Sequence, residues 1–211
     1  MSDNLRNDII RIARQFNSTG LSFGRSGNIS ARTRQGFLIT PSAVDYETLN
    51  ANDLSELDHD GEVIAGDQIP SSEWQLHQAI FRQRGDVQAI VHVHSPWATG
   101  IACTRKAIPA FHYMITALGS DSIPCAEYAT FGSKTLAENV LKALGSNMAC
   151  LMSNHGQICV GPDLDSTFHY AGEVENLAKQ YCISRMAGGP VLLDAEEMQV
   201  NIEKFKSYGK Q

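Results

Sequence analysis

The sequence predicts an α/β three-layer sandwich, in which a central, largely antiparallel sheet carries helices on both faces. Short apolar segments that flank tight turns alternate along the chain with longer segments of helical periodicity. Hairpin turns join antiparallel neighbours, whereas parallel strands need long crossovers. Because several expected strands are joined by hairpins, we expect the sheet to be largely antiparallel.

The first third of the chain is expected to form one helix and two hairpins. Apolar residues recur at helical spacing over residues 3–18, and a glycine follows where a helix would end. The short runs 29–32 and 37–40 flank a Gln-Gly pair, which is typical of a hairpin. An Asp-His-Asp-Gly turn over residues 58–61 predicts the second hairpin.

The middle of the chain is expected to form a helix and then a buried strand. Ser72 is placed to cap the helix, and Gln75 would complete a capping box. The apolar run 87–91 predicts a buried strand, which Pro96 would stop. Functional residues of α/β sheets commonly lie at the carboxyl ends of such strands.

The C-terminal half is expected to alternate between extended and helical segments. Residues 123–128 are expected to be extended, 133–144 helical, and 149–152 extended again. The longest periodic segment, 164–186, predicts a helix that ends before a Gly-Gly-Pro sequence.

Length and composition indicate one domain over residues 1–211. The chain has 211 residues, 43% hydrophobic and 19% charged, which is enough for a sizeable core. Glycine, proline and serine are scattered, so we expect no linker, repeat or low-complexity tract.

Charge and cysteine content exclude several classes of partner. The net charge is −6, the isoelectric point is about 5.6, and no basic run occurs, so we expect neither a nucleic acid nor a membrane as partner. The cysteines number five and include no Cys-x-x-Cys pair, which is typical of reduced thiols. With no secretion signal or apolar spanning segment expected, this predicts a cytoplasmic protein.

Three histidines and one glutamate have the pattern of a metal site. His92 and His94 end the buried strand at alternate positions, so both side chains point to one side. His155 lies beside a glycine turn, and Glu73 lies at the expected helix start. Three imidazoles leave a zinc-like ion an open position, which favours Lewis-acid chemistry. Solvated or hydrogen-bonded histidines, and a glutamate that only favours a helix N-terminus, are the alternative interpretation.

Motifs along nearly the whole chain resemble the class II aldolase/adducin family. They are Ser26-Gly27-Asn28-Ile29-Ser30, Thr40-Pro41-Ser42, Pro70-Ser71-Ser72-Glu73-Trp74, His92-Val93-His94, residues 108–115, 123–126 and 128–132, His155-Gly156, and residues 203–209. The number of motifs in matching order makes the resemblance specific. It implies the same α/β sandwich as the periodicity.

The resemblance implies a zinc-dependent aldolase that cleaves a ketose 1-phosphate to dihydroxyacetone phosphate and a short aldehyde. L-fuculose 1-phosphate, which would release L-lactaldehyde, is the best guess. His92, His94 and His155 would bind Zn²⁺, a Lewis acid, with Glu73 as a fourth ligand. Glu73 would also carry the proton to and from dihydroxyacetone phosphate.

The family pattern assigns further residues to the substrate. Phosphate and substrate binding falls to Arg25, Gly27, Asn28, Ser42, Ala43, Ser71 and Ser72, with ordinary capping and turn chemistry as the alternative. Tyr113, from a neighbouring subunit, would act as an acid, Phe131 would line the aldehyde pocket, and Tyr208 would close over it. The family also implies a homotetramer with sites at subunit interfaces.

Two positions depart from the family pattern. Arg25 stands where these aldolases usually have threonine, and Ala43 where they usually have glycine. A guanidinium fits either a phosphate or a carboxylate of the substrate. Alanine adopts a positive φ less easily than glycine. The other histidines, His59, His77, His112 and His169, are interpreted as structural or solvent-facing.

Other functions of the same fold stay open at this point. They are aldolases for deoxypentulose 1-phosphates, sugar-phosphate dehydratases and oxo-acid phosphate decarboxylases, since fold alone does not separate them. Epimerases with this fold resemble one another in a Ser-Ser-Asp motif, whereas this chain has Ser71-Ser72-Glu73, which makes an epimerase the weaker alternative. An adducin-like binding module is the non-enzymatic alternative, but such a module would have lost the metal ligands.

Overall fold

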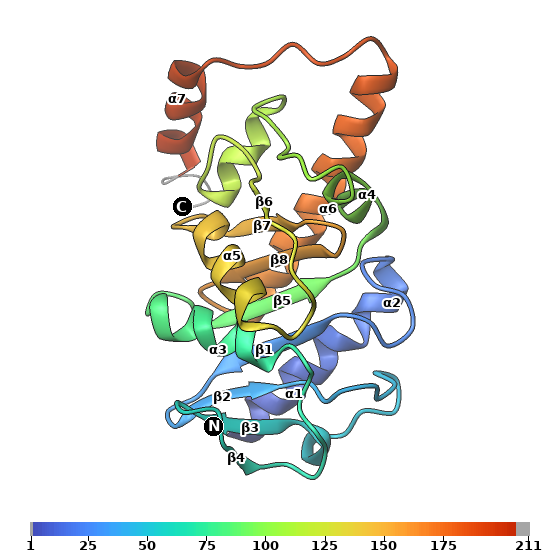
Figure 1. Ribbon diagram of the computed structural model, residues 1–211, viewed down its shortest axis with the longest axis vertical. Coiled ribbons are helices and arrows are strands. Elements are labelled where there is room, and N and C mark those ends of the chain that lie inside the picture. Colours follow the sequence, from blue (N-terminus) through green and yellow to red (C-terminus); the bar gives the residue numbers. More distant parts are fainter. Residues whose placement is uncertain (1, 206–211) are drawn as a thin grey trace.

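A computed structural model describes residues 2–205 (Figure 1). The helices are α1 (Ser2–Ala13), α2 (Gln15–Thr19), α3 (Trp74–Gln83), α4 (Pro96–Ala102), α5 (Lys134–Leu144), α6 (Leu164–Met186) and α7 (Ala195–Phe205), with 3₁₀ turns η1 (Ala51–Asp53) and η2 (Tyr113–Leu118). The strands are β1 (Asn28–Arg32), β2 (Gly36–Ile39), β3 (Ser55–Asp58), β4 (Val63–Ala65), β5 (Ala89–Val93), β6 (Cys125–Ala126), β7 (Ala149–Met152) and β8 (Gly156–Gly161).

The strands form one sheet in the order β4-β3-β2-β1-β5-β8-β7-β6. Every neighbouring pair is antiparallel except β6 and β7, which are parallel. The predicted, largely antiparallel sheet is therefore confirmed. Both hairpins are present, as β1–β2 and β3–β4.

Helices cover both faces of this sheet, as the sandwich prediction required (Figure 1). One hydrophobic core lies between the sheet and α1, α2, α4 and α6, and includes Phe16, Val91 and Val174. Met198 of α7 joins this core from the η2 side. A second core lies between the opposite face and α3 and α5, and includes Ile80 and Val140. Within residues 2–205, no helix combines the length and the apolar character needed to span a bilayer.

The side chains of β5 alternate between the two cores. Val91 and Val93 lie in the core beneath α6, whereas Ile90 lies in the core beneath α3 and α5. His92 has the same parity as Ile90, so its side chain faces the α3 side of the sheet. The central position of β5, between β1 and β8, leaves His92 fully buried.

Several local expectations are corrected. The helix expected over residues 3–18 is two helices, with a break at Arg14. The capping box of Ser72 with Gln75 is wrong, because α3 begins at Trp74 and Glu73 occupies the N-cap position without a side-chain cap bond. The extended segment 123–128 contains only the two-residue strand β6.

Three elements were not expected from the sequence. Pro96 ends the β5 segment but also occupies the first turn of α4, a position that proline favours. The strand β8 directly follows the short turn after β7. All of its residues are buried, so it has no pattern of alternating polar and apolar residues that would indicate a strand. The helix α7 lies beyond the Gly-Gly-Pro sequence and packs on η2.

Tyr46 ties a loop outside the sheet to the turn that precedes β1. Its ring packs edge-on against Phe16, with ring centroids 5.6 Å apart, and its hydroxyl donates a 2.6 Å hydrogen bond to the carbonyl of Gly27. Gly27 has φ +86°, and a Cβ there would lie 2.7 Å from the carbonyl oxygen of His92. The turn therefore requires glycine, and Tyr46 holds it against β5.

We predict that Tyr46→Phe lowers the free energy of unfolding by about 1–2 kcal/mol, because the partly buried Gly27 carbonyl loses its donor. Burial raises the pKa of Tyr46 to about 12, above its ordinary value of 10.0. The stability linked to the protonated hydroxyl is therefore complete below pH 10 and is lost as the pH rises toward 12. Urea unfolding at neutral and alkaline pH should show a smaller alkaline loss in Tyr46→Phe. Equal stability and equal alkaline loss in both proteins would contradict this role.

Candidate functional site

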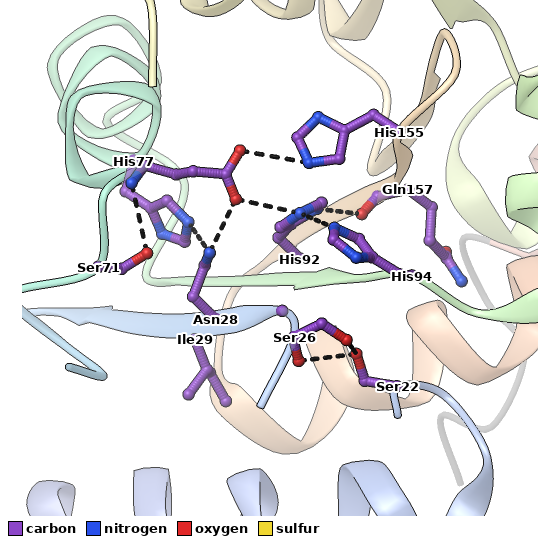
Figure 2. Close-up of polar contacts among 12 residues, drawn as sticks. Ser22, Ser26, Asn28, Ile29, Ser71, His77, His92, His94, His155 and Gln157 are labelled. Carbon is purple, nitrogen blue, oxygen red and sulfur yellow. Dashed lines mark hydrogen bonds and ion pairs between the residues drawn. The ribbon is translucent and has the colours of Figure 1, made fainter. Parts of the chain in front are cut away.

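The three predicted metal-binding histidines converge at the end of β5. His92 lies in the strand, His94 follows its last residue, and His155 lies in the turn between β7 and β8 (Figure 2). One ligand nitrogen from each ring lies within 4.8 Å of the others. The Nε2 atoms of His92 and His94 are 3.0 Å apart. This spacing suits nitrogens that share one ion.

Backbone pairing of β5 with β8 orients the first of these rings. The Nδ1 atom of His92 lies 2.8 Å from the carbonyl oxygen of Gln157, which pairs with Val93 across the two strands. Since a carbonyl only accepts, Nδ1 carries a proton, so in the neutral ring Nε2 is the nitrogen that presents a lone pair to the cluster. A second hydrogen bond, from the Gln157 amide to Ser95 Oγ at 2.7 Å, holds the adjoining backbone.

Glu73 approaches the histidines from the start of α3. The side chain is buried, with its Oε2 atom 3.2 Å from Nε2 of His92 and its Oε1 atom 3.4 Å from Nε2 of His155. Asn28 on β1 donates a 3.0 Å hydrogen bond to Oε2. Oε1 is buried but accepts no hydrogen bond from any described group. One carboxylate oxygen is thus held by a hydrogen bond, whereas the other has none and contacts only the His155 ring among the polar contacts of the described residues.

Electrostatics favour an ionised carboxylate and two neutral imidazoles at the site. Burial would lower the pKa of the third imidazole, His92, but the charge and hydrogen bond of Glu73 and the Gln157 carbonyl raise it. Burial would raise the pKa of Glu73, but the charges of His92 and His155 and the hydrogen bonds of His92 and Asn28 lower it below its usual range. Burial, with His92 and His155 nearby, lowers the pKa of His94 to about 3. Burial and His92 lower the pKa of His155 to about 4. Near neutral pH the carboxylate is ionised and these two imidazoles keep their lone pairs.

The same residues open onto a cavity of about 410 Å³. The predicted site residues that line it are Arg25, Gly27, Asn28, Ser42, Ala43, Ser71, Ser72, Glu73, His94, Phe131 and His155. His92 lies beneath the cavity and is fully buried. The structure thus brings together six separate stretches of the chain, which the sequence showed only as separate motifs.

The two departures from the family pattern contact each other at the cavity. Nη1 of Arg25 donates a 3.1 Å hydrogen bond to the carbonyl of Ala43. Ala43 has φ 59°, so the turn adopts the left-handed conformation although alanine stands there. This hydrogen bond uses one donor of the guanidinium, which has five.

One predicted residue, Tyr113, does not line the cavity of its own chain. Tyr113 begins η2, is 47% exposed, and stacks between His112 and Phe205. It is absent from the cavity lining. Tyr208 lies outside the described residues.

Sequence reasoning missed several neighbours of the site. Tyr128 and Asn154 line the cavity, and Arg105 donates a 2.7 Å hydrogen bond to Asn154 beside the Tyr128 ring. His77 was interpreted as structural or solvent-facing, but it is fully buried and lies one helical turn beyond Glu73. The spacing of four residues from Glu73 was the signal that places both side chains on one helix face.

Comparisons with known proteins agree with this geometry. Residues 7–182 match the model of the family described as class II aldolase and adducin N-terminal domain. The chain is 43% identical over 205 residues to a 5-methylthioribulose-1-phosphate/5-deoxyribulose-1-phosphate aldolase of Rhodospirillum rubrum, covering 97% of this chain and 92% of that protein. It is 41% identical over 206 residues to an L-fuculose phosphate aldolase of Escherichia coli, covering 97% and 95% of the two chains.

A solved structure supports the same assignment. A structure of L-fuculose 1-phosphate aldolase superposes with a TM-score of 0.94 at 38% identity and covers 98% of both chains. Class II aldolases are metal-dependent enzymes, and the histidine cluster of this chain provides a place for the metal. The chain therefore belongs to the class II aldolase and adducin family, and within it to the aldolases, which are aldehyde-lyases.

Proposed function

We propose that this protein is a zinc-dependent aldolase that cleaves a ketose 1-phosphate to dihydroxyacetone phosphate and a short aldehyde. The observation that carries the proposal is the convergence of three imidazole nitrogens and the Glu73 carboxylate at one end of the polar cavity. L-fuculose 1-phosphate is the first candidate substrate, because an aldolase named for it is similar over nearly the whole chain.

The donor set fits a zinc ion. His92, His94 and His155 would hold it, since neutral imidazoles are zinc ligands, and a three-histidine set leaves a position open. Glu73 Oε1, buried without a hydrogen-bond donor, is placed to complete the site when no substrate is bound. A bound zinc ion supplies Lewis-acid stabilisation of the negative charge that develops when the carbon–carbon bond breaks.

The proton is handled by the carboxylate. Oε2 of Glu73 is held by Asn28, whereas Oε1 accepts no hydrogen bond and faces the cluster. We assign to Oε1 the transfer of the proton to and from the carbon of dihydroxyacetone phosphate at which the bond is cleaved. Phe131, which is 65% exposed at the cavity rim, would form the apolar wall for the aldehyde.

The phosphate is assigned to other lining residues of the cavity. Ser42, Ser71, Ser72 and Arg25 line it, together with Gly27 and Ala43. The four donors of Arg25 that Ala43 does not use would serve a phosphate oxygen. Asn28 also lines the cavity, donates to Glu73, and would contact the substrate.

The remaining assignments rest on the family resemblance. We infer one domain over the whole chain, a homotetramer and a cytoplasmic location. The free cysteines support the last of these, because reduced thiols are typical of the cytoplasm. Tyr113, exposed on its own chain, would reach the site of a neighbouring subunit as the acid for the aldehyde oxygen, and Tyr208 would close that site.

A second candidate substrate is a 5-deoxypentulose 1-phosphate or its methylthio analogue. The similarity to the Rhodospirillum rubrum aldolase favours it at 43% identity. Both candidates would release dihydroxyacetone phosphate, so they share the metal and Glu73 and differ at the aldehyde end. The pocket near Phe131 and Tyr128 would make the distinction.

We predict that zinc-loaded protein releases dihydroxyacetone phosphate from at least one of the two candidate substrates, and that Glu73→Gln lowers kcat by about 100-fold or more, because an amide does not take up the proton. A coupled assay of dihydroxyacetone phosphate measures both. Glu138→Gln, on the exposed face of α5, serves as the matched control and should keep the wild-type rate. Wild-type activity in Glu73→Gln, or no release by zinc-loaded wild type, would contradict the proposal.

We also predict that Gly156→Ala reduces bound zinc. A Cβ at this position would lie 2.6 Å from the carbonyl oxygen of Val93 and 2.9 Å from Cδ2 of His94, so the β5 backbone or the His94 ring must shift, and we expect this to disturb the histidine cluster. Gly100→Ala is the matched control, since a Cβ there meets nothing within 4 Å. Elemental analysis after zinc loading and gel filtration should give less zinc in the first variant only. Full zinc content in Gly156→Ala would show that the close contact of Gly156 with Val93 and His94 is not needed for zinc binding.

A further inference from the structure

A buried chain of hydrogen bonds runs from β1 through α3 to Glu73. Ser30 Oγ lies 2.6 Å from Nδ1 of His77, and Nε2 of His77 lies 2.6 Å from Oδ1 of Asn28. The amide nitrogen of Asn28 then donates to Oε2 of Glu73 at 3.0 Å. Figure 2 shows the His77 ring beside Asn28, on the side away from the metal-binding histidines.

The carboxylate determines the direction of every bond in this chain. An ionised carboxylate only accepts, so the nitrogen and not the oxygen of the Asn28 amide must face Glu73. The amide oxygen then faces His77, whose Nε2 must carry a proton. Burial lowers the pKa of His77 to about 3, so its ring is neutral and Nδ1 accepts from the Ser30 hydroxyl.

The opposite amide orientation is unfavourable at the carboxylate. It would place the oxygen of Asn28 against the Glu73 carboxylate, and a buried mismatch of this kind costs about 1–3 kcal/mol. The NH₂ group would then face Nε2 of His77, which accepts it only if the ring proton moves to Nδ1. His77 holds the favoured orientation, because the oxygen of Asn28 has no other hydrogen-bond partner among the contacts of the described residues.

We propose that His77 is a positioning residue, which fixes the amide of Asn28 so that it donates to Oε2 of Glu73 and leaves Oε1 free for the proton. The catalytic part of this inference rests on the proposed function. Burying a histidine is costly unless both ring nitrogens are satisfied, and an apolar side chain would fill the space beneath α3 at lower cost. The presence of His77 at this buried position is explained by its hydrogen bond to the Asn28 amide.

The tautomer of His77 is the direct structural test. In zinc-loaded protein with ¹⁵N-labelled histidine, the signal that disappears in His77→Gln belongs to His77. We expect that signal to show a protonated Nε2 and an unprotonated Nδ1 near neutral pH. A protonated Nδ1, or a doubly protonated ring, would overturn the inference whatever the activity of the protein.

The functional test compares two substitutions of the same residue. His77→Met removes the donor, whereas His77→Gln keeps an N–H group near the position of Nε2. In zinc-loaded protein, exchange of the C3 hydrogen of dihydroxyacetone phosphate with D₂O reports the Glu73 proton step without aldehyde. We expect His77→Met to lower this rate by about 10- to 100-fold with little change in KM, and His77→Gln to restore most of it.

Ser55→Ala serves as the matched control, because it removes a buried hydroxyl that donates to Gln68 far from the site. It should keep the wild-type exchange rate, and thermal unfolding should show that both His77 variants are folded. Equal rates in wild type and His77→Met, or equal losses in both His77 variants, would overturn the positioning role.

Failure of the proposed function gives a different pattern. If wild type exchanges no hydrogen, the aldolase proposal fails, and crystal structures then decide the inference. An Asn28 amide that rotates away from Glu73 in His77→Met but not in His77→Gln supports it. An unchanged Asn28–Glu73 bond in His77→Met overturns it.

Discussion

The pairing of β5 with β8 is the contact on which the rest of the site depends. Antiparallel register places His92 opposite Ile158 and Val93 opposite Gln157, so the Gln157 carbonyl reaches the His92 ring. The same register brings Gly156 against the carbonyl of Val93, close enough that only glycine fits without displacement. Two of the imidazoles thereby come from the end of β5 and the third from the short turn before β8. Paired strands hold all three, which favours a preorganised site.

A second layer of contacts joins this end of β5 to α3. The helix begins at Trp74 with Glu73 at its N-cap, where the carboxylate contacts His92 and accepts from Asn28. Asn28 pairs with His92 across β1 and β5, so one register positions both the first imidazole of the cluster and the amide that holds Glu73. His77 extends the arrangement into the core, where water does not compete for its hydrogen bonds.

Much of this arrangement was predictable from periodicity and motif spacing. The long helix α6 was predicted with its observed bounds, and the alternation at His92 and His94 placed both on one side of a strand. The strand β8 was missed, and with it the contact that orients His92, because strand pairing is a long-range property that local patterns do not record. The partnership of Arg25 with Ala43, and of His77 with Asn28, depends on side chains from distant segments and became visible only in the fold.

We propose that three imidazoles and one carboxylate of this chain bind a single zinc ion, and X-ray absorption spectroscopy of zinc-loaded, substrate-free protein measures that ligand set. We expect three imidazole nitrogens at about 2.0–2.1 Å and one oxygen at about 2.0–2.2 Å, with an unchanged nitrogen count in Glu73→Gln. A sulfur ligand at about 2.3 Å, or fewer than three imidazoles, would contradict this site, because it would move the metal to one of the cysteines or away from the strand end.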